Sequence, residues 1–178
     1  MMRLAPLIFV CLVGIAPASP QPAAAPAVPE YSAKAGFLTT FTKYTSWPAG
    51  AFESATAPLV IGVIGHDPFG DVLDKAAAGQ GGRPLEVRRL RSQKEAELCH
   101  VVFIGKTASR TEAEWLAALS SRPILTVGES GEPSSRGSIV QFVLVGNRLS
   151  FDVNLAAADQ AGIRLSSDLL SHARQVMR

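Results

Sequence analysis

The sequence contains few cysteines and little excess charge of either sign. Its 178 residues include two cysteines, too few for a disulfide framework or a cysteine zinc site. The 17 basic and 15 acidic residues give a net charge of +2, so the chain lacks the dense basic surface of a nucleic-acid-binding protein. Charged residues make up 18% and hydrophobic residues 47%, which excludes an intrinsically disordered chain. A single globular domain remains.

Established enzyme motifs are also missing from the sequence. No glycine-rich loop ends in Lys-Ser or Lys-Thr, so phosphoryl chemistry on a P-loop is unsupported. The stretch GESGE approaches a nucleophile elbow, but Glu132 replaces its second glycine, which favours a turn role for Ser130. The three histidines lack the spacing of a helical metal-binding pair: His66, His100 and His172. We expect no catalytic residue, no metal and no cofactor.

The first 18 residues have the pattern of a secretory signal peptide. Arg3 precedes a run of about ten apolar residues, and Ala16-Pro17-Ala18 supplies the small residues of a cleavage site. That run is about half of the ~20 residues needed to cross a bilayer. Residues 19–29, SPQPAAAPAVP, follow as an extended Pro/Ala-rich linker. We therefore expect an exported protein whose folded domain covers residues 30–178.

Buried strands alternate with helices along this domain. Three runs have the continuous hydrophobicity of parallel strands covered on both faces: 59–65, 100–105 and 124–128. A less buried strand is expected at 85–90, and helices at 31–44, 67–77, 92–98, 111–119, 155–161 and 167–176. Runs 139–145 and 149–153 flank Gly146-Asn147-Arg148, which predicts an antiparallel hairpin. The order predicts a single-domain α/β fold, a mostly parallel sheet with helices on both faces and a C-terminal antiparallel hairpin.

The carboxyl ends of the buried strands are the best candidate for a small-ligand cleft. His66 and Asp67 follow the first strand, Lys106 the second and Glu129 the third. Open α/β sheets bind ligands at this edge, and a helix N-terminus after Asp67 would favour an anion. In the alternative, Asp67 only caps its helix and His66 is solvated.

Cys99 is the only cysteine that would remain after cleavage of the signal peptide. It precedes a buried strand, and we expect it to pack as a small apolar side chain. The alternative is an exposed thiol that forms a disulfide between two chains, which an oxidising compartment permits.

Several short motifs, taken in order, resemble the YfiR family. They are KAGFL at 34–38, PLVIGVIGHDPFG at 58–70, GRPL at 82–85, CHVVFI at 99–104, PILTVG at 123–128, FDVNL at 151–155 and LSSDLL at 165–170. The resemblance covers roughly residues 31–176. It implies a periplasmic α/β protein without catalytic activity, which binds the sensor domain of an inner-membrane diguanylate cyclase and holds the cyclase inactive. It also implies a homodimer, and an outer-membrane lipoprotein that relieves the repression and so raises cyclic-di-GMP and biofilm formation.

A repressor of this kind needs a binding surface with apolar anchors and a polar rim. The partner-binding candidates are the aromatic residues of the first helix and its exit and the turn after the first buried strand: Phe37, Tyr44, Trp47, Phe52, His66, Asp67 and Phe69. The alternative for the aromatics is core packing. Other functions left open are a periplasmic small-ligand sensor, an accessory subunit of another membrane signalling protein such as a sensor kinase, and, least favoured, a hydrolase using Ser130 or His66.

Overall fold

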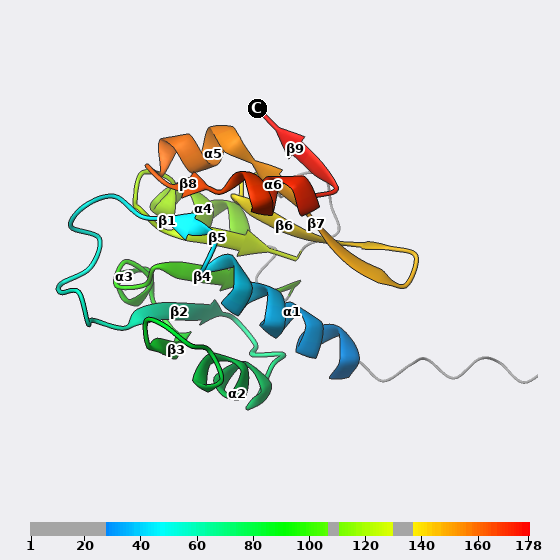
Figure 1. Cartoon of the computed structure of the whole chain (residues 1–178), viewed down its shortest axis with the longest axis horizontal. Coiled ribbons are helices and arrows are strands. Elements are labelled where there is room, and N and C mark those ends of the chain that lie inside the picture. The colour runs from blue at the N-terminus through cyan, green and yellow to red at the C-terminus, as the bar shows by residue number, and fades with distance from the viewer. Residues whose placement is uncertain (1–27, 107–110, 130–136) are drawn as a thin grey trace, which may run out of the picture.

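A seven-stranded sheet forms the centre of the molecule (Figure 1). Its strands are β2 (Leu59–Ile64), β3 (Leu85–Leu90), β4 (Val101–Ile104), β5 (Leu125–Gly128), β6 (Val140–Val145), β7 (Arg148–Asn154) and β9 (Gln175–Met177), in the order β3-β2-β4-β5-β6-β7-β9. The computed structural model describes residues 28–106, 111–129 and 137–178. The predicted signal peptide and the linker up to residue 27 lie outside the described residues.

The strand directions confirm the predicted mostly parallel sheet with a C-terminal hairpin. Strands β3, β2, β4, β5 and β6 run parallel, and β7 returns antiparallel to β6. Gly146 makes the tight turn with a φ of 61°, a conformation that glycine adopts without steric cost. Strands β2, β4 and β5 are buried along their whole length, because helices cover both faces of the sheet there.

The last strand corrects the predicted helix at 167–176. Helix α6 (Ser167–His172) stops early, and β9 adds to the sheet parallel to β7. The Arg174 backbone N–H donates to the Phe151 carbonyl (2.8 Å) and the Arg174 guanidinium bonds the Asp152 carboxylate. The open edge of β7 thus supplies partners that a longer helix would not have, so the hairpin is not the outer edge of the sheet.

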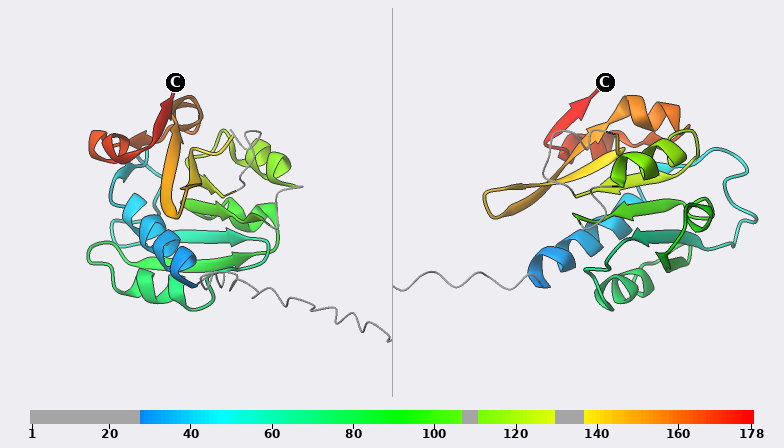
Figure 2. Two further views of the ribbon diagram at one scale, coloured as in Figure 1. Left: turned by 90° about the vertical axis from the view of Figure 1, so that its right-hand side faces the viewer. Right: turned by 180° about the vertical axis from the view of Figure 1, so that it is seen from behind.

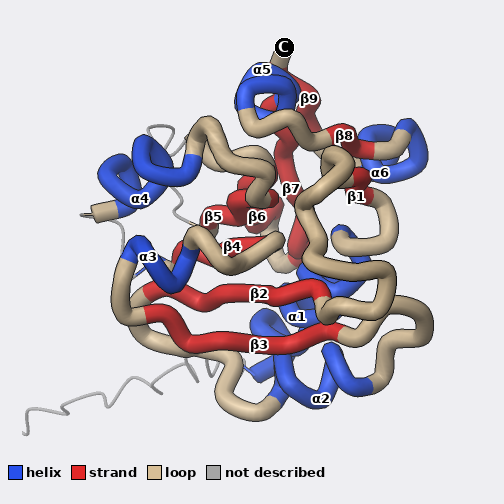
Figure 3. The backbone as a smooth tube through the Cα atoms, turned by 90° about the vertical axis from the view of Figure 1, so that its left-hand side faces the viewer, coloured by secondary structure: helices blue, strands red, loops and turns tan. Residues whose placement is uncertain are grey.

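Helices cover both faces of the sheet, as predicted, and they enclose two separate cores (Figure 2, Figure 3). The larger core lies under α1 (Val28–Phe41), α2 (Val72–Ala78), α5 (Leu155–Gln160) and α6, and the smaller under α3 (Gln93–Ala96) and α4 (Glu112–Leu119). Alternate residues of β2 serve the two cores, since Ile61 and Val63 face the larger one and Ile64 the smaller one.

The boundaries of α1 and α2 also differ from the predicted ones. Helix α1 ends at Phe41, because Thr45–Ser46 forms a short strand, β1, antiparallel to β8 (Arg164–Leu165). Helix α2 begins at Val72, not at Asp67, and Asp67 instead accepts the Phe69 backbone N–H (2.8 Å) within a turn. Gly70 follows with a φ of 55°, a left-handed conformation that interrupts a helix. The short helix expected at 92–98 is α3, and Ser92 caps it by accepting from the Glu95 backbone N–H.

Gly62 of β2 faces the smaller core at a place where no side chain fits. A Cβ atom there would lie 2.5 Å from Leu90 Cδ1 and 2.9 Å from Cys99 Sγ. We expect Gly62→Ala to lower the free energy of unfolding by about 1–3 kcal/mol, the usual cost of overpacking, measured by urea denaturation.

Gly36→Ala is the matched control for this substitution. Gly36 is exposed on α1 with no atom within 4 Å of its Cβ position, so the change should stabilise the protein by roughly 0.5–1 kcal/mol. Equal stability of the Gly62→Ala protein and the wild type would contradict the close packing of β2 against β3.

Candidate functional site

A cavity of about 340 Å³ lies at the carboxyl ends of β4 and β5, between α1 and the β6–β7 hairpin. One part of its lining is charged, with Glu30, Lys34, Lys106, Glu129 and Arg174. The other part is an apolar wall from the hairpin, with Phe142, Val143, Leu144, Val145 and Leu149. The site therefore combines charged groups with a hydrophobic surface, which suits an amphipathic ligand or a segment of a protein partner.

A buried ion pair forms the floor of this cavity. Lys34 Nζ donates to Glu129 Oε2 at 2.5 Å, and both side chains are only 2% exposed. The Lys106 backbone N–H donates to Glu129 Oε1 at 2.9 Å, and the Tyr31 hydroxyl approaches the same oxygen at 3.4 Å. Each carboxylate oxygen of Glu129 therefore has a donor, which is the condition for keeping a charge out of water.

Glu30 connects the buried pair to the rim of the cavity. Its carboxylate bonds the Lys34 ammonium, and Lys106 Nζ lies 3.9 Å from it. The hydrogen bond from Lys34 lowers the pKa of Glu30. Burial, and then the negative charge of Glu129, raise the pKa of Tyr31 to about 12. Tyr31 thus keeps its proton at neutral pH and remains a hydrogen-bond donor toward Glu129.

Lys106 and Glu129 meet as the order of the strands predicts, but sequence reasoning missed the residues of α1 that join them. Lys34 is the informative one, because it is a charged residue beside Ala35 and Leu38 on the buried face of the helix. A lysine in such a stripe needs a buried acid, and Glu30 one turn earlier supplies only part of the compensation. That pattern in the sequence was the available signal for the site.

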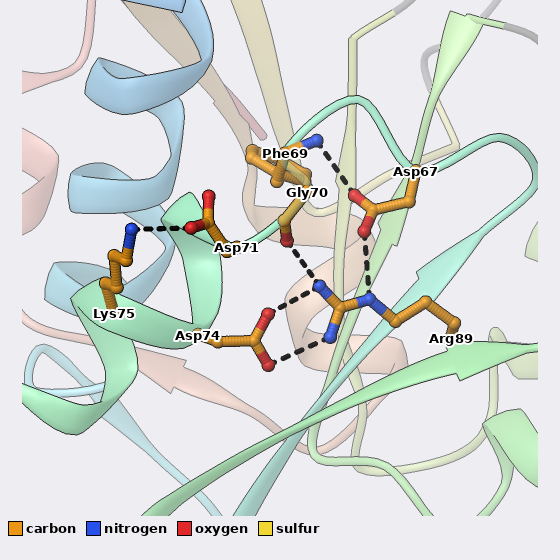
Figure 4. A network of polar contacts seen from close by, with 7 residues as sticks. All are labelled: Asp67, Phe69, Gly70, Asp71, Asp74, Lys75 and Arg89. Carbon is orange, nitrogen blue, oxygen red and sulfur yellow. Dashed lines mark hydrogen bonds and ion pairs between the residues drawn. The ribbon is translucent and has the colours of Figure 1, made fainter.

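Asp67 belongs to a separate polar network, which joins the turn after β2 to Arg89 of β3 and to α2 (Figure 4). Arg89 Nε donates to Asp67 Oδ2 (2.9 Å), while the rest of the guanidinium bonds both oxygens of Asp74 (2.9 and 2.6 Å) and the Gly70 carbonyl. These bonds lower the pKa of Asp74 and raise that of Arg89. Arg89 thereby ties the turn and α2 to β3, and Asp67 does not line the cavity.

His66 and the aromatic residue at the end of its turn are also placed apart from the cavity. His66 is exposed, and the cavity lining does not include it. Phe69 is 3% exposed, with its ring against Tyr31 and Phe103. Of the four residues expected to form a ligand cleft, the structure therefore brings together Lys106 and Glu129 only.

The remaining partner-binding candidates occupy different parts of the molecule. Phe37 is half-buried against the aromatic residues of the larger core. Trp47 and Phe52 lie at the amino end of β4, where the Phe52 ring stacks on His100 with 4.3 Å between centroids. Tyr44 is 38% exposed. No single surface contains all of them.

The most exposed apolar residues near the cavity are at the tip of the hairpin. Leu144 and Val145 are 51% and 54% exposed, and the hairpin extends beyond the helices around it (Figure 1). Sequence reasoning noted this strand but not its surface. The signal was an apolar run, Val143-Leu144-Val145, that continues to the turn without the polar alternation of a solvent-exposed strand.

Cys99 packs into the smaller core, in agreement with the expected apolar role. It is 4% exposed and forms no disulfide with any residue that the structure describes, and burial raises the pKa of its thiol to about 11. The alternative of an exposed thiol that links two chains does not fit this placement.

The structure bears differently on the hypotheses of a catalytic serine, a metal site and a membrane-spanning helix. Ser130, the residue of the elbow-like stretch, lies outside the described residues. Within residues 28–106, 111–129 and 137–178, no group of three or more His, Cys, Asp or Glu side chains is arranged to hold a metal ion. Among the helices of those same ranges, none has the length and hydrophobicity needed to span a bilayer.

Two solved structures resemble the described fold. A conserved domain protein from Vibrio cholerae O1 biovar El Tor str. N16961 has a TM-score of 0.57 and 15% identity, over 82% of this chain and 60% of that one. The ABC domain from Streptococcus pneumonia, crystallised in complex with L-Trp, has a TM-score of 0.56 and 12% identity, over 80% of this chain and 60% of that one. At such identities the likeness shows the α/β fold alone.

The match to a family is more specific. The model of the YfiR/HmsC-like family matches residues 31–174, which include most of the described helices and strands and every residue of the cavity lining except Glu30. This agrees with the resemblance inferred from the motifs of the sequence. The chain belongs to the YfiR/HmsC-like family, whose members are regulatory and not catalytic.

Proposed function

We propose that this protein is a periplasmic regulator that binds the sensor domain of an inner-membrane diguanylate cyclase and holds the cyclase inactive, which lowers cyclic-di-GMP and biofilm formation. The observation that carries the proposal is the family match over residues 31–174. The signal-peptide pattern of residues 1–18 supports export, and residues 19–29 would then be a spacer before the folded domain. The N-terminal sequence of the protein recovered from periplasm tests this processing.

Repression requires only that the protein bind one conformation of the cyclase more tightly than the other. A difference of about 4 kcal/mol in binding free energy shifts that equilibrium roughly a thousandfold. No reaction has to be catalysed. The protein needs a stable surface with a few desolvated anchor residues, and a rigid sheet provides such a platform.

The tip of the β6–β7 hairpin is the surface that fits this role best. Leu144 and Val145 offer apolar anchors, and the cavity behind them can accept a side chain of the partner. Half-exposed charges line the same cavity as these anchors, among them Lys106 and Arg174. An apolar centre with a polar rim is the usual composition of a protein interface. Tyr44, the exposed aromatic residue, stays a secondary candidate.

Deletion of the gene tests the proposed function as a whole. We expect cyclic-di-GMP to rise in the deletion strain, and a tagged copy of the protein to recover a diguanylate cyclase from solubilised inner membrane. Unchanged nucleotide levels together with no recovered cyclase would refute the proposal, while recovery of a sensor kinase would support the accessory-subunit alternative.

The pair Leu144→Asp and Val145→Asp tests the proposed surface. We expect each to weaken binding of the recovered sensor domain by about 30-fold, the effect of losing one anchor worth about 2 kcal/mol. Leu98→Asp is the matched control, because Leu98 is 65% exposed at the opposite end of the sheet. Binding should be measured by titration of the purified domain. Equal affinities for the Leu144→Asp and Leu98→Asp proteins would exclude the hairpin as the binding surface.

The resemblance also leads us to propose a homodimer, and an outer-membrane lipoprotein that relieves the repression. Sedimentation velocity of the mature protein tests the first of these partners. A pull-down from outer membrane, repeated with the cyclase present as competitor, tests the second.

A small-ligand sensor is a second candidate function, which the cavity of about 340 Å³ favours. Its volume is at the lower end of the range for small-molecule sites. A thermal-shift screen of amino acids and other small amphipathic compounds distinguishes the two functions. L-Trp belongs in that screen because one protein of similar fold binds it. A compound that raises the melting temperature without any partner would favour the sensor.

A further inference from the structure

His100 joins three segments of the chain at the amino end of the sheet. Its Nδ1 atom accepts the Val60 backbone N–H at 3.1 Å, and its Nε2 atom lies 2.9 Å from the Ala51 carbonyl oxygen. A backbone N–H can only donate and a carbonyl oxygen can only accept. The imidazole is therefore neutral, with its proton on Nε2 and a lone pair on Nδ1.

The segment between β1 and β2, residues 47–58, depends on this ring for its position. Phe52 stacks on the imidazole with 4.3 Å between centroids and 11° between planes. Trp47 Nε1 donates to the His100 carbonyl at 3.3 Å, and its ring packs edge-on against Phe52. Arg83 adds a contact, with its guanidinium over the Phe52 ring and a bond to the Ala57 carbonyl. We call residues 47–58 the 47–58 loop.

We propose that His100 is an acid-sensitive latch, and that protonation of its Nδ1 atom releases the 47–58 loop and exposes Trp47 and Phe52. A proton on Nδ1 would point at the Val60 N–H, so two donors would face one another where a hydrogen bond now lies. The ring must then turn away from β2, which removes the stacking surface for Phe52 and the bond to Ala51. The neutral and charged forms of one side chain thus favour two positions of the loop.

The surroundings of His100 oppose its protonation while the loop is closed. Arg83 and Arg88 place positive charges near the ring, and a cavity of about 320 Å³ beside it is lined by further ionisable groups, which are Glu53, Glu97, Cys99 and Arg122. Burial lowers the pKa of His100 below its ordinary value of 6.5, and the two arginines lower it further, against the raising effect of the bond to Ala51.

The direction of the pH dependence follows from this lowered pKa. An open loop or an unfolded chain binds the proton more readily than the closed form does, so acid favours opening. The closed loop should be fully stable above pH 6.5 and should lose stability as the pH falls from 6.5 toward the lowered pKa of His100. Below that pKa, His100 should cause no further loss of stability.

Trp47 reports on the loop directly once the other tryptophan is removed. The chain has two tryptophans, so Trp115→Phe leaves Trp47 as the only one. Between about pH 8 and pH 5, where histidine is the side chain that ordinarily titrates, we expect the Trp47 emission to shift to the red with a midpoint below 6.5. His100→Gln in the same background should abolish the shift, because glutamine offers an acceptor and a donor but does not titrate.

His66→Gln and His172→Gln are the matched controls, and both should keep the transition because those histidines lie elsewhere in the fold. An emission maximum that does not move with pH, or one that still moves in the His100→Gln protein, would overturn the proposal. If that variant does not fold, nitrogen chemical shifts of the wild-type imidazoles decide, and a His100 that carries its proton on Nδ1 at neutral pH would refute the latch. The measurement uses no partner, so its outcome is independent of the proposed function, although any effect of the latch on repression rests on it.

Discussion

Replacement of Lys34 by methionine is expected to lower the free energy of unfolding by about 3–5 kcal/mol, the cost of leaving a buried charge without its counterion. Glu129 would stay in the floor of the cavity, 2% exposed, with hydrogen bonds from Lys106 and Tyr31 but no cation at 2.5 Å. Methionine keeps most of the length of lysine, so the loss reports on charge more than on packing. Urea denaturation at neutral pH measures it.

Two further variants separate the buried pair from ordinary surface charge. Lys75→Met removes a cation from the Lys75–Asp71 pair, in which both side chains are more than 70% exposed, and should change stability little. Glu129→Gln in the Lys34→Met background should recover much of the loss, because glutamine still accepts the Lys106 N–H and no charge is left buried. Similar stabilities of the Lys34→Met and Lys75→Met proteins would show that the ion pair does not hold the site together.

Truncation of Phe41 to alanine is expected to cost about 3–5 kcal/mol, since it opens a cavity in the larger core. The ring is fully buried, and its centroid lies 5.8 Å from that of Phe142 and 5.1 Å from that of Phe151. Phe41 thus joins α1 to both strands of the hairpin. Its removal would loosen the same hairpin that carries the proposed partner surface, so binding should weaken along with stability.

Phe37→Ala is the matched comparison, one turn earlier on the same helix. Phe37 contacts Phe142 and Phe151 as well, but it is only half-buried, so its truncation should cost clearly less. Both variants are measured by urea denaturation and by partner titration. An equal loss of stability for the two would contradict the assignment of Phe41 as the anchor of α1.

The buried strands were predictable because their apolar runs are short and continuous, a pattern typical of strands covered on both faces. The meeting of Lys106 and Glu129 was predictable for the same reason, since parallel strands end at one edge. Asp67 misled because Asp-Pro is typical of a helix start, whereas here Arg89 holds its carboxylate and Gly70 interrupts the backbone. The local sequence around Asp67 gives no sign of Arg89, which comes from another strand and binds the same carboxylate.

Other elements had no local signal to predict them. Strands β1 and β8 have two residues each and β9 has three, too short for any periodicity, and they form because tertiary structure brings partners beside them. Lys34 lies in an otherwise apolar stripe, and its role became visible only with Glu129, 95 residues later in the chain. The hairpin tip gave a signal in its unbroken apolar run, but exposure depends on what the rest of the fold leaves uncovered.

The pairing of β1 with β8 has a consequence for synthesis and export. Thr45 pairs with Leu165, and the aromatic face of α1 packs on strands that come more than a hundred residues later. During synthesis or export the N-terminus emerges first. The hydrophobic face of α1 therefore stays exposed until nearly the whole domain has emerged. Such contacts form late and leave the growing polypeptide open to self-association. We therefore expect folding of this protein to depend on chaperones more than the folding of a domain whose contacts are local in sequence.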